Sequence, residues 1–208
     1  MAQHEQAPHT LTIIGPEGAG KTTLRDLLAP AIGGLALTVP EWPSLQPFLA
    51  DPHAYAYDNQ RDALSYTTAA YAEATYSDAA YIVADNCPDR IHLTHSWRLR
   101  EEGHIDDDQW AALEAQYTQA ATEWGTSYVF LDVSRAALQS RLVARKRPED
   151  IERNLAMADW TSARWKEIIT RPDWRMGKHL LELNGEEDPV ALRDVVQSWL
   201  GIERDDAV

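Results

Sequence analysis

Short apolar runs recur along the chain, separated by longer segments that mix apolar and polar residues. Five of these runs predict strands, because they are short, rich in β-branched, aromatic or leucine residues, and bounded by turn-forming or acidic residues. They are residues 10–14, 35–39, 81–84, 128–131 and 179–183. The first of them is typical of a buried parallel strand. Strands that alternate with helices are typical of a doubly wound sheet, so we expect an α/β fold with five parallel strands flanked by helices.

Helices are predicted between these strands. The expected ranges are 21–28, 59–78, 90–102, 107–123, about 134–145, 148 onward and 188–200. Pro30, Gly103 and Gly201 mark three of the expected helix ends. Pro148 suits the first turn of the helix that follows it, where apolar residues such as Trp165 recur at helical spacing.

The segment after the second predicted strand is rich in proline and is expected to be irregular. Its prolines are Pro40, Pro43, Pro47 and Pro52. A loop this long inside a compact domain is usually a binding segment or a lid, so we expect a substrate loop around residues 40–58. The sequence has no internal repeat, low-complexity segment or linker, and we therefore expect a single domain over residues 1–208.

Composition narrows the class of protein. The chain has 33 acidic against 19 basic residues and a formal charge of −14, which makes DNA an unfavoured partner because the surface repels a polyanion. No run approaches the roughly 18 apolar residues of a membrane span. The polar segment Met1–His9 is unlike a secretory signal, and the single cysteine, Cys87, fits a reducing compartment. We therefore expect a cytoplasmic protein.

The strongest chemical signal follows the first predicted strand. Gly15-Pro-Glu-Gly-Ala-Gly-Lys21-Thr22 is a glycine, four residues and then Gly-Lys-Thr. Glycines let successive backbone amides point at phosphate oxygens, and the helix that follows adds its positive end. Lys21 is expected to bridge the β- and γ-phosphates and Thr22 to hold Mg²⁺. The expected nucleotide contacts are Gly15, Glu17, Gly18, Ala19, Gly20, Lys21, Thr22 and Thr23.

Phosphate loops of this kind occur in GTPases, ATPases and kinases. A GTPase would need an Asn-Lys-x-Asp segment after a later strand, and the sequence contains none. Acidic residues stand instead at the ends of predicted strands, where kinases keep groups that contact the substrate. The sequence therefore predicts an ATP-dependent phosphotransferase with ATP and Mg²⁺ as cofactors.

Four segments resemble the deoxynucleoside kinases and their thymidylate kinase relatives, over roughly residues 10–200. They are the glycine loop, Thr38-Val-Pro-Glu41-Trp42, Asp85-Asn-Cys-Pro-Asp89-Arg90 and Arg141-Leu-Val-Ala-Arg145-Lys-Arg147-Pro-Glu149. The resemblance implies a general base at Glu41, a functional acid at Asp85 and an arginine-rich lid around residues 141–153. It also suggests a homodimer formed through helices.

The chain departs from this family directly after Asp85. The family has an arginine there, whereas this chain has Asn86, and two residues are missing before Asp89. Either Arg90 or a lid arginine is then expected to approach the transferring phosphate, or the acceptor differs from that of the family. Asp85 is also the expected second ligand of Mg²⁺, beside Thr22.

The residues themselves favour a hydroxyl as the phosphate acceptor. Glu41 and Asp85 both follow predicted strands, whose carboxyl ends gather ligands in such a sheet. A hydroxyl benefits from a carboxylate that takes its proton, whereas a phosphate acceptor needs arginines to hold it. Arg61, Arg90 and Arg98 suit either scheme. The structural alternatives are a solvated loop acid for Glu41 and a turn cap for Asp85.

The remaining candidates belong to the lid and to the acceptor pocket. Arg141 and Arg145 lie four residues apart on one helix face and can close over ATP, or can form a solvated basic helix end. The candidate catalytic residues are Lys21, Glu41, Asp85, Arg90, Arg141 and Arg145. The candidate acceptor residues are Glu41, Trp42, Gln60, Asp89 and Arg90, with Tyr66 and Leu93 as further pocket walls. Each pocket residue could instead pack in the core.

The leading hypothesis is a nucleoside or deoxynucleoside kinase, with Glu41 or Asp85 as the base. One alternative is a nucleoside monophosphate kinase similar to thymidylate kinase. A second is a kinase of a hydroxyl carried by a modified base in DNA or by another small metabolite. A third is a nucleotide-binding subunit without catalytic activity. Base preference, sugar preference and oligomeric state do not follow from the sequence.

Overall fold

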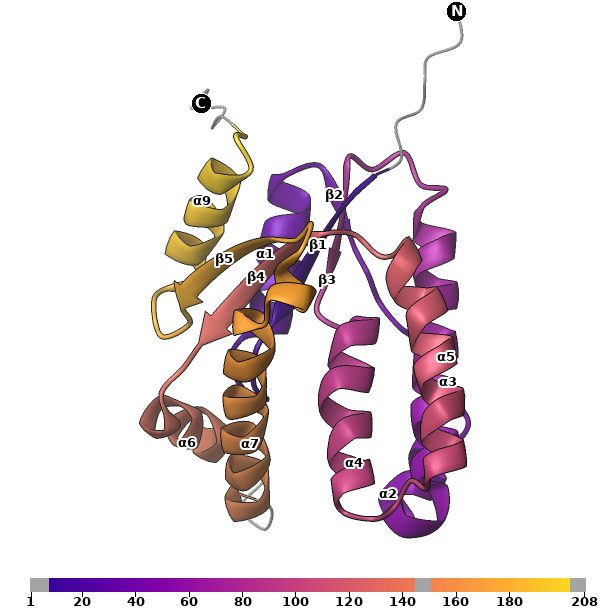
Figure 1. Cartoon of the computed structure of the whole chain (residues 1–208). Coiled ribbons are helices and arrows are strands. Elements are labelled where there is room, and N and C mark those ends of the chain that lie inside the picture. Colours follow the sequence, from indigo (N-terminus) through magenta and orange to yellow (C-terminus); the bar gives the residue numbers. More distant parts are fainter. Residues whose placement is uncertain (1–7, 145–150, 203–208) are drawn as a thin grey trace, which may run out of the picture. The chain divides into compact units, whose positions relative to one another are not determined.

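The sheet contains five parallel strands. The computed structural model describes residues 8–144 and 151–202 (Figure 1). The strands are β1 (His9–Ile14), β2 (Gly34–Ala36), β3 (Tyr81–Ala84), β4 (Ser127–Asp132) and β5 (His179–Asn184). They lie in the order β2-β3-β1-β4-β5, and every pair of neighbours is parallel. The predicted five-stranded parallel α/β fold is confirmed.

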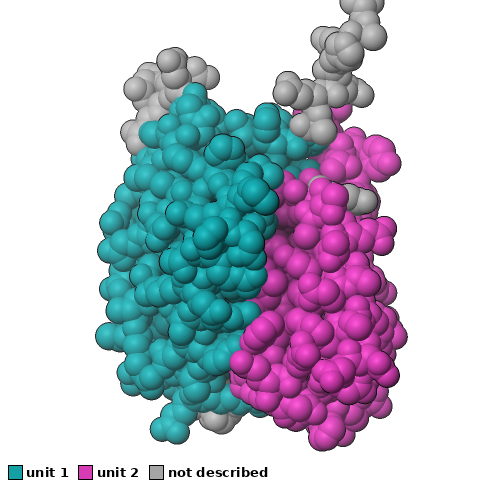
Figure 2. Space-filling view, viewed as in Figure 1, with its two compact units in different colours: residues 1–36, 79–85, 126–208 teal, residues 37–78, 86–125 magenta. Residues whose placement is uncertain are grey.

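The chain divides into two compact units, coloured separately in Figure 2. Unit 1 comprises residues 1–36, 79–85 and 126–208 and contains all five strands. Its helices are α1 (Lys21–Ala31), α6 (Arg135–Ala144), α7 (Ile151–Thr170), α8 (Pro172–Arg175) and α9 (Pro189–Trp199). Unit 2 comprises residues 37–78 and 86–125. Its helical elements are α2 (Leu45–Ala50), α3 (Pro52–Ala74), the π-helix η1 (Arg90–Ser96), α4 (Trp97–Glu101) and α5 (Asp107–Glu123).

Each unit has its own apolar core. In unit 1, side chains from the strands pack with side chains from the helices on the sheet; the buried members include Leu11, Ile13, Leu24, Leu28, Val129, Leu131, Leu142, Leu155, Leu192 and Val196. In unit 2, the buried members are Ala56, Ala63, Leu64, Ile91, Leu99, Ile105 and Leu113. Ala19 of the phosphate loop is a buried member of the core of unit 1. The single-domain organisation expected over residues 1–208 stays a prediction.

The proline-rich segment is more regular than its sequence predicts. Pro47 is the third residue of α2, where its missing N–H would have no partner inside the helix. Pro52 opens α3, which the Asp51 carboxylate caps by accepting a hydrogen bond from the Ala54 amide. The expectation that these prolines exclude regular structure is therefore wrong.

Other boundaries also differ from the predicted ones. The helix predicted over residues 59–78 is α3, which spans Pro52–Ala74, and the helix predicted over residues 90–102 begins as the π-helix η1. Helix α1 continues to Ala31 through Pro30, because proline removes only its own amide and Ile32 still bonds back to the Leu28 carbonyl. Strand β2 ends at Ala36, since the chain enters unit 2 at Leu37. The short helix α8 has no counterpart among the predicted elements. The predicted helix start at Pro148 lies outside the described residues.

Candidate active site

The phosphate loop connects β1 to α1 with the backbone that its glycines allow. Gly15, Gly18 and Gly20 have positive φ angles of 144°, 83° and 96°. At Gly15 a side chain would also collide, because a Cβ atom there would lie 2.7 Å from the Leu131 carbonyl oxygen. The loop therefore requires glycine where the sequence supplies it.

Lys21 lies within this loop. It is the first residue of α1 and is buried. Its Nζ donates hydrogen bonds to the carbonyl oxygens of Gly15, at 2.9 Å, and Pro16, at 2.6 Å. The ammonium group is thus folded over the loop, where a phosphate binds in loops of this type.

Arg141 ties three segments of unit 1 together. From α6, its NH1 donates to the carbonyl oxygens of Ala19, at 3.0 Å, and Gly18, at 3.3 Å. Its NH2 donates to the carbonyl oxygen of Gly185, at 2.7 Å, in the loop between β5 and α9. One guanidinium group therefore joins the phosphate loop to the loop that follows the last strand.

A cavity of about 280 Å³ lies beside this connection. Its lining comes from the phosphate loop, α1, β4, α6, the β5–α9 loop and α9, and includes Gly18, Gly20, Leu24, Leu131, Arg141, Gly185 and Leu192. Leucine and glycine walls next to a phosphate loop suit a flat, weakly polar group such as the base of a nucleotide.

Asp85 lies at the end of β3, where its carboxylate contacts two residues of α1. One oxygen, Oδ2, accepts a hydrogen bond from the Thr22 hydroxyl. The other, Oδ1, accepts from NH1 of Arg25 at 2.9 Å. The structure thus brings together the two residues expected to hold Mg²⁺, and adds an arginine that the sequence analysis did not single out. Arg25 follows Thr22 by three residues, and that helical spacing was the available signal.

The Thr22–Asp85 pair fits a magnesium ion. Mg²⁺ takes oxygen ligands and is usually held by one or two protein groups together with substrate phosphates. Both side chains supply such oxygens beside the phosphate loop. Among residues 8–144 and 151–202, no cluster of three or more His, Cys, Asp or Glu side chains could hold a metal by itself.

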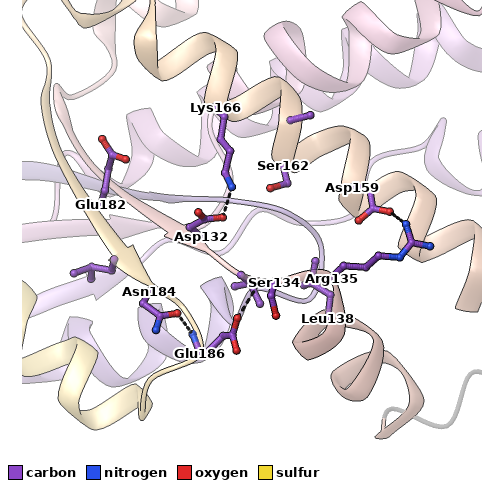
Figure 3. A pocket seen from close by; sticks show the side chains of 13 residues that line it. Asp132, Ser134, Arg135, Leu138, Asp159, Ser162, Lys166, Glu182, Asn184 and Glu186 are labelled. Carbon is purple, nitrogen blue, oxygen red and sulfur yellow. Dashed lines mark hydrogen bonds and ion pairs between the residues drawn. The ribbon is translucent and has the colours of Figure 1, made fainter.

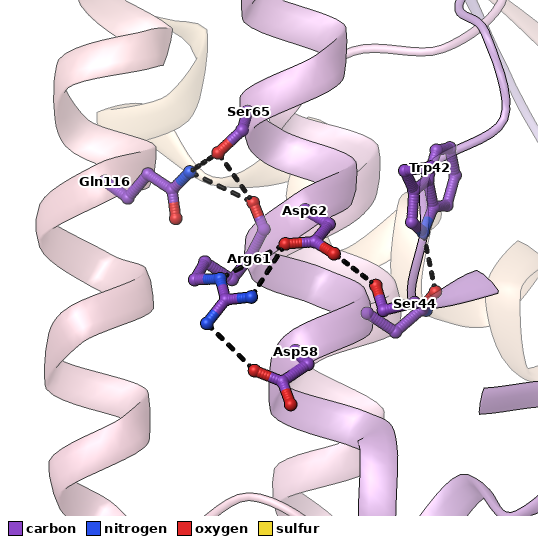
Figure 4. A network of polar contacts seen from close by, with 8 residues as sticks. Trp42, Ser44, Asp58, Arg61, Asp62, Ser65 and Gln116 are labelled. Carbon is purple, nitrogen blue, oxygen red and sulfur yellow. Dashed lines mark hydrogen bonds and ion pairs between the residues drawn. The ribbon is translucent and has the colours of Figure 1, made fainter. Parts of the chain in front are cut away.

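Unit 2 contains the predicted acceptor residues. The indole of Trp42 donates to the Asn59 side chain at 2.7 Å, which joins the segment before α2 to α3. Nearby, Arg61 pairs with Asp58 and Asp62, and Asp62 also accepts from the Ser44 hydroxyl (Figure 4). The hydrogen bond with Asp62 raises the pKa of Arg61. This network anchors residues 42–44 to one face of the helix.

The segment after Asp85 makes its own contacts inside unit 2. The Asn86 amide donates to the Thr67 hydroxyl at 3.3 Å and accepts from NH1 of Arg90 at 3.2 Å. Asp89 is buried and accepts from the Tyr117 hydroxyl at 2.9 Å. The π-helix that starts at Arg90 is a rare element that often occurs at functional sites.

Gln60 and His92 are also buried in unit 2. The Gln60 oxygen accepts from the Ser96 hydroxyl at 3.3 Å. The His92 ring stacks between Trp110 and Tyr117, at 4.4 and 4.5 Å, and its Nε2 lies 2.8 Å from a Glu114 carboxylate oxygen. Burial lowers the pKa of His92, against the opposing hydrogen bond with Glu114.

A second cavity in unit 1, of about 750 Å³, is lined by the ends of β4 and β5 and by α6 and α7 (Figure 3). Four of its charged side chains form two ion pairs: Lys166 with Asp132, at 2.8 Å, and Arg135 with Asp159. The Glu186 carboxylate accepts from the Ser134 amide at 2.9 Å, and this contact lowers the pKa of Glu186. The sequence analysis did not predict this cavity.

The predicted site residues therefore fall into two groups. Those on the donor side, in unit 1, are the loop residues 15–23, Asp85 and Arg141. Those on the acceptor side, in unit 2, are Glu41, Trp42, Gln60, Asp89 and Arg90. Arg145 lies outside the described residues. Their roles stay predictions, as do those of Tyr66 and Leu93.

A parallel sheet in this strand order, with a glycine-rich phosphate loop between β1 and the first helix, defines a P-loop nucleotide-binding fold. The family model of the deoxynucleoside kinases matches residues 11–162 of the 208. The chain therefore belongs to the deoxynucleoside kinase family. It is an enzyme, a nucleoside kinase that binds a nucleotide of the ATP type.

Solved structures share the fold. The deoxyadenosine kinase of M. mycoides with the products dCMP and a flexible dCDP bound has a TM-score of 0.74 and 17% identity, over 92% of this chain and 98% of that chain. The structure of the same kinase with dCTP bound has a TM-score of 0.73 and 15% identity, over 92% of this chain and 98% of that chain. The structure with dATP bound has a TM-score of 0.74 and 16% identity, over 92% of this chain and 99% of that chain. No curated protein sequence matches the chain significantly. In residues 8–144 and 151–202, no helix is long and apolar enough to cross a membrane.

Proposed function

We propose that this kinase transfers the γ-phosphoryl group of Mg-ATP to a hydroxyl of a nucleoside or deoxynucleoside. The observation that carries the proposal is the contact between Thr22 and Asp85 beside the phosphate loop. It supports a donor side in unit 1 that holds both the phosphates and their metal ion. The acceptor side is assigned to unit 2.

On the donor side, each group has a distinct task. The loop amides and Lys21 hold the phosphates, and the cavity beside Arg141 takes the base. Thr22 and Asp85 would hold Mg²⁺, which neutralises charge on the phosphate oxygens when it is bound. Arg141 keeps the phosphate loop and the β5–α9 loop in one arrangement.

Glu41 is the better candidate for the general base. Both oxygens of Asp85 accept hydrogen bonds, from Thr22 and Arg25, and this fixed orientation suits a residue that binds Mg²⁺. Within the described part of the chain, Glu41 is exposed and makes no hydrogen bond or ion pair. Its carboxylate is thus available to accept the proton of an incoming hydroxyl.

Gln60 and Asp89 are proposed to read the nucleobase. Both are buried in unit 2, and in the described residues the Gln60 amide nitrogen makes no hydrogen bond, so it can donate to an acceptor atom of a base. Asp89 is oriented by the Tyr117 hydroxyl. Trp42, held by Asn59, would supply an aromatic wall.

A nucleoside monophosphate as the acceptor is less well supported. Such an acceptor needs arginines that can turn toward its phosphate. Arg61 is engaged by Asp58 and Asp62, and Arg98 by Glu102 at 2.7 Å. Arg90 donates to Asn86. The arrangement therefore favours a neutral acceptor with a hydroxyl group.

The test is an ADP-release assay with Mg-ATP and separate acceptor pools: nucleosides, nucleoside monophosphates and hydroxymethylated DNA. The M. mycoides structures hold adenine and cytosine deoxynucleotides, so deoxyadenosine and deoxycytidine are the first nucleosides to try. We expect nucleosides to stimulate ADP release. Stimulation by monophosphates alone, or by DNA alone, would contradict the assignment. The cytoplasmic location and the homodimer stay predictions.

A further inference from the structure

We propose that Arg25 is the positioning residue for the Asp85 carboxylate, and thereby sets the geometry of the magnesium site. This inference rests on the proposed function, because it assumes that Thr22 and Asp85 hold the metal ion of the donor nucleotide. Arg25 lies on α1, three residues after Thr22, so one helix face presents both contacts to the end of β3.

The Arg25 guanidinium is itself held in place. Its NH1 donates to Asp85 Oδ1 at 2.9 Å, while Nε and NH2 both point at Asp26 Oδ1 at 2.8 Å. Only 14% of the Arg25 side chain and 17% of the Asp85 side chain are exposed, so water screens the pair weakly. Asp26 thus orients Arg25, and Arg25 orients Asp85.

The consequence is a carboxylate with one defined orientation. With Oδ1 held by Arg25, the other oxygen is left facing the Thr22 hydroxyl. Without Arg25, the Asp85 carboxylate could rotate about its Cβ–Cγ bond. Fewer of its orientations would then place a carboxylate oxygen where it and the Thr22 hydroxyl can bind the same Mg²⁺ ion. Residues that orient metal ligands typically alter metal affinity or activity by about 10- to 100-fold when they are replaced.

A second effect of Arg25 has the opposite sign. Its positive charge partly neutralises Asp85 and so weakens the attraction of that carboxylate for a cation. If neutralisation dominated, removal of Arg25 would tighten magnesium binding. If positioning dominates, removal weakens it. The two roles are therefore distinguished by the direction of the change.

The chain offers a matched control in α9. Arg193 donates through Nε and NH2 to Asp194 Oδ1, at 2.9 and 2.6 Å, in the same local arrangement as Arg25 with Asp26. Within the described residues, the side-chain hydrogen bonds of Arg193 go to Asp194, and none goes to Asp85 or the phosphate loop. Arg193→Gln therefore removes an equivalent neighbouring pair and leaves the magnesium site untouched.

The experiment measures the ATP dissociation constant with and without Mg²⁺, by calorimetry without an acceptor, for the unmodified protein, R25Q, R25K and R193Q. We expect the gain in ATP affinity from Mg²⁺ to fall about tenfold in R25Q, with a smaller change in metal-free binding. R25K keeps the charge but cannot reach Asp26 and Asp85 together, so its gain should fall severalfold. R193Q should match the unmodified protein.

Two results would overturn the positioning role. One is an undiminished gain in R25Q, which includes equal losses of affinity with and without Mg²⁺, and the other is a larger gain. If R25Q fails to fold, judged by its melting curve, R25K decides by the same criteria. Should the unmodified protein gain no ATP affinity from Mg²⁺, the metal assignment in the proposed function fails instead.

Discussion

Replacement of Arg141 by glutamine should damage both the stability of unit 1 and the binding of ATP. The guanidinium makes two short hydrogen bonds, of 2.7 Å to Gly185 and 3.0 Å to Ala19, and a longer one of 3.3 Å to Gly18. Hydrogen bonds from charged donors contribute about 1.5–3 kcal/mol each. Because this side chain is partly exposed, we take the lower value for the two short bonds.

The expected loss is then about 3 kcal/mol in the free energy of unfolding, or several degrees in Tm. If the loop needs this tether in order to bind phosphate, a loss of that size corresponds to a rise of up to about 100-fold in the ATP dissociation constant. Denaturant unfolding and calorimetric titration with ATP measure the two quantities on the same preparation.

Arg135→Gln is the control, because Arg135 lies on the same helix, is exposed and pairs with Asp159 alone among the described residues. Its replacement should change the free energy of unfolding by less than about 0.5 kcal/mol. The tether argument is refuted if Arg141→Gln binds ATP as tightly as the unmodified protein and unfolds at the same denaturant concentration.

Three further predictions concern other parts of the chain. Glu41→Gln should lower kcat with a nucleoside by about 10²- to 10⁴-fold and leave the ATP dissociation constant unchanged; near-normal turnover would remove Glu41 as the base. Gly15→Ala should destabilise the protein by at least about 1–3 kcal/mol in denaturant unfolding, since the new Cβ meets the Leu131 carbonyl and φ is positive; an unchanged midpoint would refute this. Because the pKa of His92 lies below its ordinary 6.5, the unfolded chain takes up more protons as the pH falls through that value, so the free energy of unfolding should decrease there. His92→Phe should flatten that decrease, and an identical pH profile in the variant would contradict it.

Elements with strong local signals were predictable from the sequence. Strand β3 and helix α5 have the bounds predicted for them. For α5 the reason is local, since Asp106 and Gln109 cap its start by exchanging hydrogen bonds between side chain and backbone. The phosphate loop was predictable for the same reason, because its glycines and Lys21 are neighbours in the chain.

Features that depend on distant residues were not predictable in the same way. Arg25 lies three residues beyond the phosphate-loop motif, and its contact with Asp85 forms only where β3 brings Asp85 to α1. The Tyr117–Asp89 contact likewise joins residues 28 positions apart. Proline misled the prediction at α2 because its effect depends on the position in the helix, which the residue type alone does not give.

The most direct test of the central claim is ADP release by the unmodified protein and by Lys21→Ala, with Mg-ATP and a pool of nucleosides. The claim is that the loop amides and Lys21 hold the terminal phosphates of ATP during transfer. We predict nucleoside-stimulated ADP release in the unmodified protein and its loss, by at least about 100-fold, in Lys21→Ala. Equal ATP consumption by the two proteins would contradict the account.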